Sequence, residues 1–258
     1  KAIHFLDNVI DMCHYPTPET KEIVHKNRKI GLGVMGFAEM LIKLKVSYNS
    51  DRAVKTAEKI IAFIRQEADK ASMDLAKERL TFPSWEDSIY NKKGKAKPMP
   101  LRNATRLTIA PTGSISIIAG TSFGIEPLFA LTFMQVLDDG TELLTVDKHF
   151  KETLKKINLY NAEFMKYIAK KGTIENMESI PKSIRDIFVV SYDISPEYHI
   201  KIQAAFQKHV DNGISKTITL SNTATVEDVK NAYILAHKLG CKGISIYRFG
   251  SRDDQVFF

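Results

Sequence analysis

The chain has 258 residues, 44% of them hydrophobic and 26% charged, with a formal net charge of +7 and a pI near 9.2. This composition is ordinary for a globular protein, and no run of about 18 apolar residues or leader peptide is present, so we expect a soluble, cytoplasmic protein. The densest lysine cluster, Lys92, Lys93, Lys95 and Lys97, has none of the companions of a nucleic-acid surface and predicts a solvated loop.

The first 80 residues carry a helical pattern. Apolar side chains recur at helical spacing between Ile3 and Ile10, and Pro16 and Pro18 separate this helix from the next. Residues 51–77 predict a long amphipathic helix. The proline-rich residues that follow, 81–103, are expected to form a surface loop.

Gly31, Gly33 and Gly36 match the G-x-G-x-x-G pattern of dinucleotide-binding folds. The residues before them, 25–29, are basic and polar, whereas a dinucleotide fold needs a buried strand there. We therefore exclude that fold and expect these small residues to let two helices pack closely.

A strand over residues 106–109 is predicted to lead into a Pro-Thr-Gly-Ser turn, residues 111–114. A turn rich in glycine and hydroxyl residues presents backbone N–H groups that can bind an anion, most often a phosphate. The next predicted elements are a strand near residues 128–136, insertion helices over 143–157 and 162–171, and a short strand over 186–191.

The last quarter alternates helices and strands. Ser195 and Pro196 predict a helix start, Thr225 with Asp228 resembles a capping box at the start of another helix, and Gly240 ends that helix. The predicted strands on either side of the second helix are residues 214–220 and 243–248. Strands joined by crossover helices pair in parallel, which predicts an α/β protein, either an open sheet or part of a barrel.

Cysteine and histidine spacing gives no sign of a metal site. Cys13 and Cys241 are far apart in sequence, which is typical of reduced thiols, and none of the seven histidines stands in an H-x-x-x-H or H-E-x-x-H pattern. His209, on an apolar helix face, is interpreted as a hydrogen-bonded residue of the core or one that supports a site residue. No local motif for a catalytic nucleophile appears.

Four sequence blocks, in their order along the chain, resemble the large catalytic subunit of ribonucleotide reductase, and look most like its class II, adenosylcobalamin-dependent branch. The blocks are residues 27–41, 104–129, 209–220 and 225–252. The resemblance implies the C-terminal portion of a ten-stranded α/β barrel, preceded by a helical segment. Residues 1–258 would form a single segment of the barrel domain, mainly helical over 1–80 and alternating over 104–258, with a helical insertion near 143–186.

The resemblance also implies the chemistry of the parent enzyme, the reduction of ribonucleotides to deoxyribonucleotides by a thiyl radical. Pro111, Thr112, Gly113, Ser114 and Ile115 match the family segment that binds the substrate phosphates. The family's Asn-x-Cys-x-Glu motif has no match, so the radical cysteine and the reducing cysteine pair are expected outside this chain. We expect the chain, as a piece of a longer protein, to be inactive alone.

The same resemblance implies adenosylcobalamin as cofactor, a ribonucleoside di- or triphosphate as substrate, a thioredoxin-type reductant and a homodimeric parent, with no nucleic-acid or membrane partner. Ile246 precedes Tyr247, so the adjacent tyrosine pair of class I enzymes is missing. Two alternatives stay open: a class I large subunit with a metal-radical partner, and a non-catalytic nucleotide-binding remnant.

Overall fold

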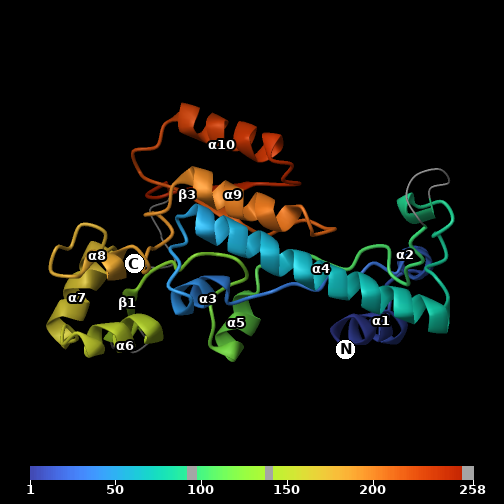
Figure 1. Ribbon diagram of the computed structural model, residues 1–258, viewed down its shortest axis with the longest axis horizontal. Coiled ribbons are helices and arrows are strands. Elements are labelled where there is room, and N and C mark those ends of the chain that lie inside the picture. Colours follow the sequence, from blue (N-terminus) through green and yellow to red (C-terminus); the bar gives the residue numbers. More distant parts are fainter. Residues whose placement is uncertain (92–97, 137–141, 252–258) are drawn as a thin grey trace. The chain divides into compact units, whose positions relative to one another are not determined.

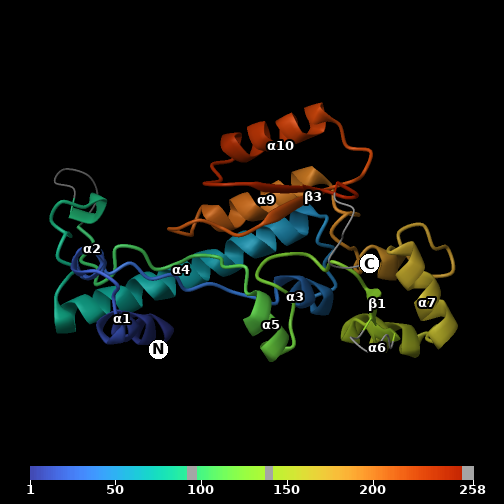
Figure 2. The ribbon, with the colours of Figure 1, turned by 180° about the vertical axis from the view of Figure 1, so that it is seen from behind.

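The computed structural model describes residues 1–91, 98–136 and 142–251, drawn as ribbons in Figure 1 and Figure 2. The predicted lysine-rich loop at Lys92, Lys93, Lys95 and Lys97 lies outside the described residues. The chain divides into two compact units. The first unit is Lys1–Val34, Ala57–Ala110 and Ala205–Ile214, and the second is Met35–Thr56, Pro111–Ala204 and Ser215–Phe258.

Helices dominate the first 80 residues, as the sequence predicts. They are α1 (Ala2–Met12), α2 (Pro18–Asn27), α3 (Phe37–Lys43) and α4 (Asp51–Arg79). Ile3 and Ile10 bury the apolar face of α1, and Pro18 is the first residue of α2. The predicted long amphipathic helix is α4, in which Ala57 and Ile61 are fully buried in the first unit.

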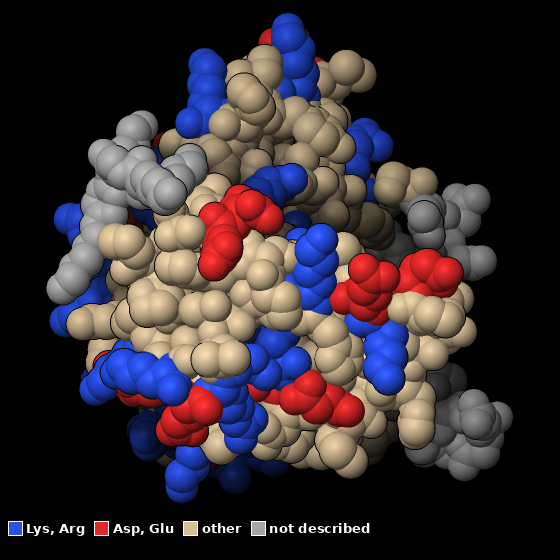
Figure 3. Space-filling view, turned by 90° about the vertical axis from the view of Figure 1, so that its right-hand side faces the viewer, with Lys and Arg blue, Asp and Glu red and all other residues tan. Residues whose placement is uncertain are grey.

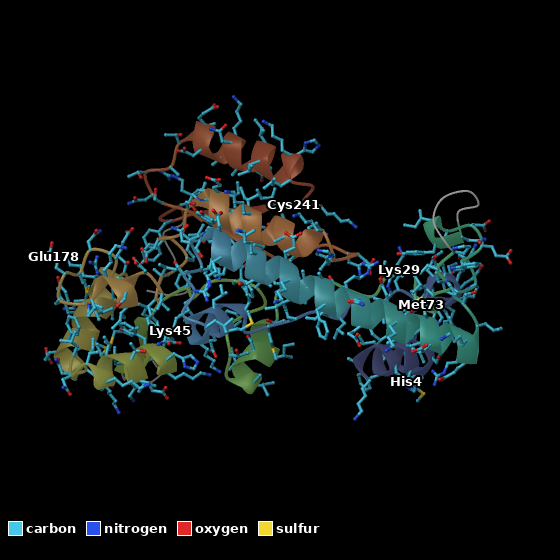
Figure 4. The ribbon with its side chains drawn as sticks, viewed as in Figure 1. His4, Lys29, Lys45, Met73, Glu178 and Cys241 are labelled. Carbon is cyan, nitrogen blue, oxygen red and sulfur yellow. The ribbon has the colours of Figure 1, made fainter. Side chains whose placement is uncertain are left out.

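A buried arginine ties together the helical part of the first unit. The Arg28 guanidinium donates to the carboxylate of Asp7 (2.8 Å) and to Asp11 (2.8 Å), and Asn103 Nδ2 also donates to Asp7 (2.9 Å). Burial by itself would raise the pKa of Asp7, but the hydrogen bonds and charge of Arg28 hold it below its usual range. His4 of α1, labelled in Figure 4, also contacts Arg79: its Nε2 lies 2.8 Å from Arg79 Nη2.

The glycine-rich segment of the first unit packs against an extended segment, and not against a helix as predicted. Leu32 and Leu107 form a parallel bridge, with Leu32 N–H donating to the Arg106 carbonyl (2.8 Å). A Cβ on Gly33 would lie 2.4 Å from the Thr108 carbonyl oxygen. Glycine therefore permits the close approach of two backbones. The predicted strand at 106–109 is reduced to bridges at Leu107 and Ile109.

The middle of the second unit differs in part from the prediction. It contains α5 (Gly113–Ala119), β1 (Thr132–Val136), β2 (Glu142–Val146), α6 (Lys148–Lys156), α7 (Ala162–Lys171) and α8 (Lys182–Arg185). The expected helix over 143–157 begins only at Lys148, because Asp147 caps it and the preceding residues pair antiparallel with β1. The expected strand over 186–191 is wrong, since Asp186 N–H still bonds back to Lys182 and only Val190 bridges, to Leu128.

The predicted alternation near the C-terminus is confirmed. Its elements are α9 (Pro196–Gln207), β3 (Thr217–Leu220), α10 (Val226–Lys238) and β4 (Ser245–Arg248). β3 and β4 pair in parallel and α10 is the crossover between them, opened by the Thr225–Asp228 capping box. β3 lies beside one end of α9 in both ribbon views (Figure 1, Figure 2), and one apolar cluster joins it to α9 and α10. The apolar cluster there is Ile200, Ile218, Leu220, Ala232 and Ala236.

Surface charge is mixed on the face drawn in Figure 3, where Lys and Arg are interspersed with Asp and Glu. None of the described helices is long and apolar enough to cross a membrane. Over the same described residues, no group of three or more histidine, cysteine or acidic side chains is arranged to hold a metal ion.

We predict that Gly33→Ala lowers the free energy of unfolding by ~1–3 kcal/mol, because the new methyl group overpacks against a backbone carbonyl that cannot move aside cheaply. The measurement is urea unfolding followed by circular dichroism. Gly213→Ala is the matched control, since a Cβ there meets nothing within 4 Å. Equal midpoints for the two variants would show that the close approach is not a constraint.

Candidate functional site

The predicted anion-binding turn opens the short helix α5. Thr112 is its N-cap and adopts the left-handed conformation, with φ 57° and ψ 27°. Gly113, Ser114 and Ile115 form the first helical turn, whose N–H groups have no acceptor within the helix. These three residues and Pro111 are exposed. The turn thus presents a row of backbone donors to solvent.

The Thr112 conformation is unusual, because a β-branched residue is disfavoured in the left-handed region. It is held by two hydrogen bonds: the buried Gly124 N–H donates to the Thr112 hydroxyl oxygen (2.7 Å), and Ser116 N–H donates to the Thr112 carbonyl (2.9 Å). Strain that is maintained by surrounding contacts is typical of functional sites. The Ser116 N–H is therefore already used within the protein.

The space in front of the turn is open. A Cβ added to Gly113 would meet nothing within 4 Å, and no positive φ requires glycine there. The Ser114 side chain is exposed beside it. The protein's own packing does not require glycine at this position. Its absence of a side chain leaves room for a ligand to approach the backbone.

Residues 122–126 support the turn from behind, and we call them the backing segment. Gly36 N–H donates to the Ser122 carbonyl (2.9 Å), and the buried Tyr48 hydroxyl donates to the Ile125 carbonyl (2.7 Å). Gly36 has φ +79°, and a Cβ there would lie 2.5 Å from the Thr121 hydroxyl oxygen. The last glycine of the misleading G-x-G-x-x-G pattern therefore packs against Thr121 and the start of the backing segment.

The backing segment ends at a buried charged cluster that the sequence analysis missed. Lys216 Nζ lies 2.7 Å from Glu126 Oε2 and 2.8 Å from His199 Nδ1, and the Lys216 side chain is fully buried. Burial lowers the pKa of Lys216, and the Glu126 carboxylate opposes that shift. No local spacing links these three residues, because they come from separate parts of the chain.

Other residues singled out from the sequence take no part in the turn. Tyr247 is half-buried on β4, opposite Thr219 of β3. The Nε2 atom of His209 is buried and has no hydrogen-bond partner among the described residues, so its interpretation as a hydrogen-bonded core residue is wrong for that atom. Cys13 is exposed, and burial raises the pKa of the half-buried Cys241, which follows α10 (Figure 4).

A separate cavity of about 630 Å³ lies in the second unit, at the carboxyl ends of β3 and β4. Ser221 and Asn222, which follow β3, line it together with Phe249, which follows β4. Phe129 and Tyr192 add aromatic walls. None of residues 111–115 lines this cavity, so it is distinct from the turn.

Comparison with known proteins gives a consistent family. The family model described as ribonucleotide reductase, barrel domain, matches residues 1–247. The chain is 46% identical over 255 residues to a Thermoplasma acidophilum protein named vitamin B12-dependent ribonucleoside-diphosphate reductase, covering 99% of this chain and 33% of the relative. A Mycobacterium tuberculosis protein of the same name is 43% identical over 255 residues, with coverages of 99% and 36%. The chain therefore spans about a third of the length of these relatives.

More distant relatives carry the same fold. A Chlamydia pneumoniae protein named ribonucleoside-diphosphate reductase subunit alpha is 31% identical over 277 residues, covering 93% of this chain and 26% of the relative. Among solved structures, the Actinobacillus ureae class Id ribonucleotide reductase alpha subunit matches with a TM-score of 0.82 at 23% identity, over 96% of this chain and 45% of that chain. This likeness confirms the predicted α/β barrel fold.

We predict that Thr112→Ala lowers the free energy of unfolding by ~1–3 kcal/mol, because it leaves the buried Gly124 N–H without an acceptor. Thr112→Ser keeps the hydroxyl and serves as the control. Its unfolding midpoint should be close to that of the unmutated chain. Chemical unfolding of the three proteins checks this. If alanine and serine variants are equally stable, the hydroxyl does not hold the turn.

Proposed function

This chain belongs to the ribonucleotide reductase barrel-domain family, and on that premise we propose that it is part of an enzyme that reduces ribonucleoside diphosphates to deoxyribonucleotides. The relatives from Thermoplasma acidophilum and Mycobacterium tuberculosis are named as diphosphate reductases, which favours diphosphates over triphosphates. This chain would contribute a segment of the barrel and a binding site for the substrate phosphates.

The phosphate site is residues Pro111, Thr112, Gly113, Ser114 and Ile115. The observation that carries the assignment is the exposed first turn of α5, in which three successive backbone N–H groups lack an intrahelical acceptor. The Ser114 hydroxyl and the hydrogen of the Thr112 hydroxyl add two further donors. Hydrogen bonds to a charged oxygen contribute roughly 1.5–3 kcal/mol each, so a few of them suffice to anchor a diphosphate.

The radical chemistry needs residues beyond those of this chain. A thiyl radical and a reducing dithiol together require three cysteines, whereas the sequence has two. Cys13 is exposed and Cys241 is half-buried, and neither belongs to the phosphate turn. We therefore assign substrate binding to this chain and leave the redox thiols, the thioredoxin-type reductant, the homodimer and the cytoplasmic location as predictions for the parent.

We propose adenosylcobalamin as the cofactor of the parent enzyme, since the 46% and 43% identical relatives are named vitamin B12-dependent. When bound, it would supply the radical that starts the reaction. The described residues do not fit the whole group: the cavity beside β3 and β4 measures about 630 Å³, which suits a drug-sized ligand and not a corrin with its side chains. We assign no residue to the cofactor. The class I alternative is not favoured, because the subunit alpha relative is only 31% identical.

We predict that Gly113→Ala weakens binding of CDP and of inorganic pyrophosphate at least about tenfold without lowering stability. The added methyl group meets nothing in the protein but occupies the space in front of the backbone donors. Isothermal titration calorimetry and thermal unfolding measure the two effects.

Gly243→Ala is the matched control for that experiment, because a Cβ there also enters open space within the second unit. It should change neither affinity nor stability. Unaltered pyrophosphate affinity in Gly113→Ala would count against the phosphate site. Failure of the unmutated 258-residue chain to bind pyrophosphate would count against it as well.

We also predict that the 258-residue chain forms no deoxynucleotide when it is incubated with CDP, adenosylcobalamin and a dithiol, because neither of its cysteines stands in the Asn-x-Cys-x-Glu motif of the radical cysteine. Chromatographic detection of deoxycytidine products checks this. Turnover by the purified chain would show that our division of roles is wrong.

A further inference from the structure

Lys216 is placed so that its ammonium group is completely satisfied. Its three N–H groups meet Glu126 Oε2 (2.7 Å), His199 Nδ1 (2.8 Å) and the Thr217 carbonyl (2.6 Å). The side chain has no exposed surface. A buried lysine is costly unless it is paired, so this geometry fixes the three acceptors relative to one another.

His199 completes the cluster as a neutral side chain. Its Nε2 lies 2.8 Å from the Ser191 carbonyl, which can only accept, so Nε2 carries the proton and Nδ1 accepts from Lys216. Burial and the adjacent Lys216 charge hold the pKa of His199 well below its usual range. The cluster therefore contains one positive and one negative charge, on Lys216 and Glu126.

Glu126 connects this cluster to the backing segment. Its Oε1 accepts from the Thr217 backbone N–H (2.7 Å) while Oε2 accepts from Lys216, so both carboxylate oxygens are held at the start of β3. Two residues earlier, Gly124 N–H holds the Thr112 hydroxyl (2.7 Å). A short run of backbone thus links the ion pair to the strained residue of the turn.

We propose that the ion pair of Glu126 with the buried Lys216 positions the turn at residues 112–115 for phosphate binding, acting through the backing segment and the Gly124–Thr112 hydrogen bond. This rests on the proposed phosphate site. Glu126 and Lys216 are positioning residues, since neither lies in the turn. Their effect is to keep the Thr112 backbone in the conformation that aligns the donors of Gly113, Ser114 and Ile115.

A charge-balanced double replacement distinguishes a positioning role of the ion pair from a purely stabilising one. Glu126→Gln leaves the fully buried Lys216 charge uncompensated and should destabilise the fold, whereas removing both charges need not. Lys216→Met leaves the Glu126 carboxylate, a quarter of which is exposed, so this single variant should lose less stability. The test uses Glu126→Gln, Lys216→Met and the double variant, in which the glutamine carbonyl can still accept from Thr217 N–H. We expect the lowest thermal midpoint for Glu126→Gln and recovery of most of that loss in the double variant.

The decisive readouts are pyrophosphate affinity and hydrogen exchange of the peptide that contains Gly124. In the double variant we expect about tenfold weaker binding and faster exchange at Gly124, approaching that of Thr112→Ala. Recovered stability with unchanged affinity and exchange would overturn the proposal, because the pair would then only stabilise. If the double variant stays unstable, Glu126→Asp, which keeps the charge but shortens the reach, must show both effects or the proposal fails.

The control is Glu197→Gln with Lys201→Met, which removes a surface ion pair of α9 (2.6 Å) by the same substitutions. It should leave affinity and exchange unchanged. If the unmutated 258-residue chain binds neither pyrophosphate nor CDP, the proposed function fails. The hydrogen-exchange measurement still decides whether the ion pair holds the turn.

Discussion

The hydrogen bond from the buried Gly124 N–H to the Thr112 hydroxyl is the contact on which the candidate site depends. It holds a β-branched residue in a backbone conformation that such residues avoid, and that conformation starts α5 directly at Gly113. Because the first turn of a helix leaves its N–H groups unpaired, the strained cap and the anion donors are parts of one arrangement. The cost of the strain is offset by contacts of the backing segment.

Each unit contains a buried cation that is paired and hydrogen-bonded. In the first unit, Arg28 is enclosed by Asp7 and Asp11, and in the second, Lys216 is enclosed by Glu126 and His199. Such pairs contribute little net stability compared with apolar packing, but they define geometry sharply, because a displaced partner leaves a buried charge unsatisfied. In the second unit the pair fixes the geometry of the backing segment, next to the proposed phosphate site.

The glycines of residues 31–36 show how one local pattern serves two structural purposes. Gly33 allows the backbone at Thr108 to approach in the first unit, and Gly36 caps α3 and accommodates Thr121 in the second. Neither use involves a dinucleotide. The pattern therefore indicates close backbone approach at both glycines.

Local signals in the sequence determined much of this protein: the long α4, the capping box of α10, and the parallel β3 and β4 with their crossover. These depend on neighbouring residues, whose spacing is visible in one dimension. Tertiary structure alone decided that residues 143–146 pair as a strand, that residues 106–109 form only bridges, and that Glu126, His199 and Lys216 meet. Those outcomes depend on partners far away in the chain, and a hydrogen bond or ion pair between distant residues leaves no spacing to read.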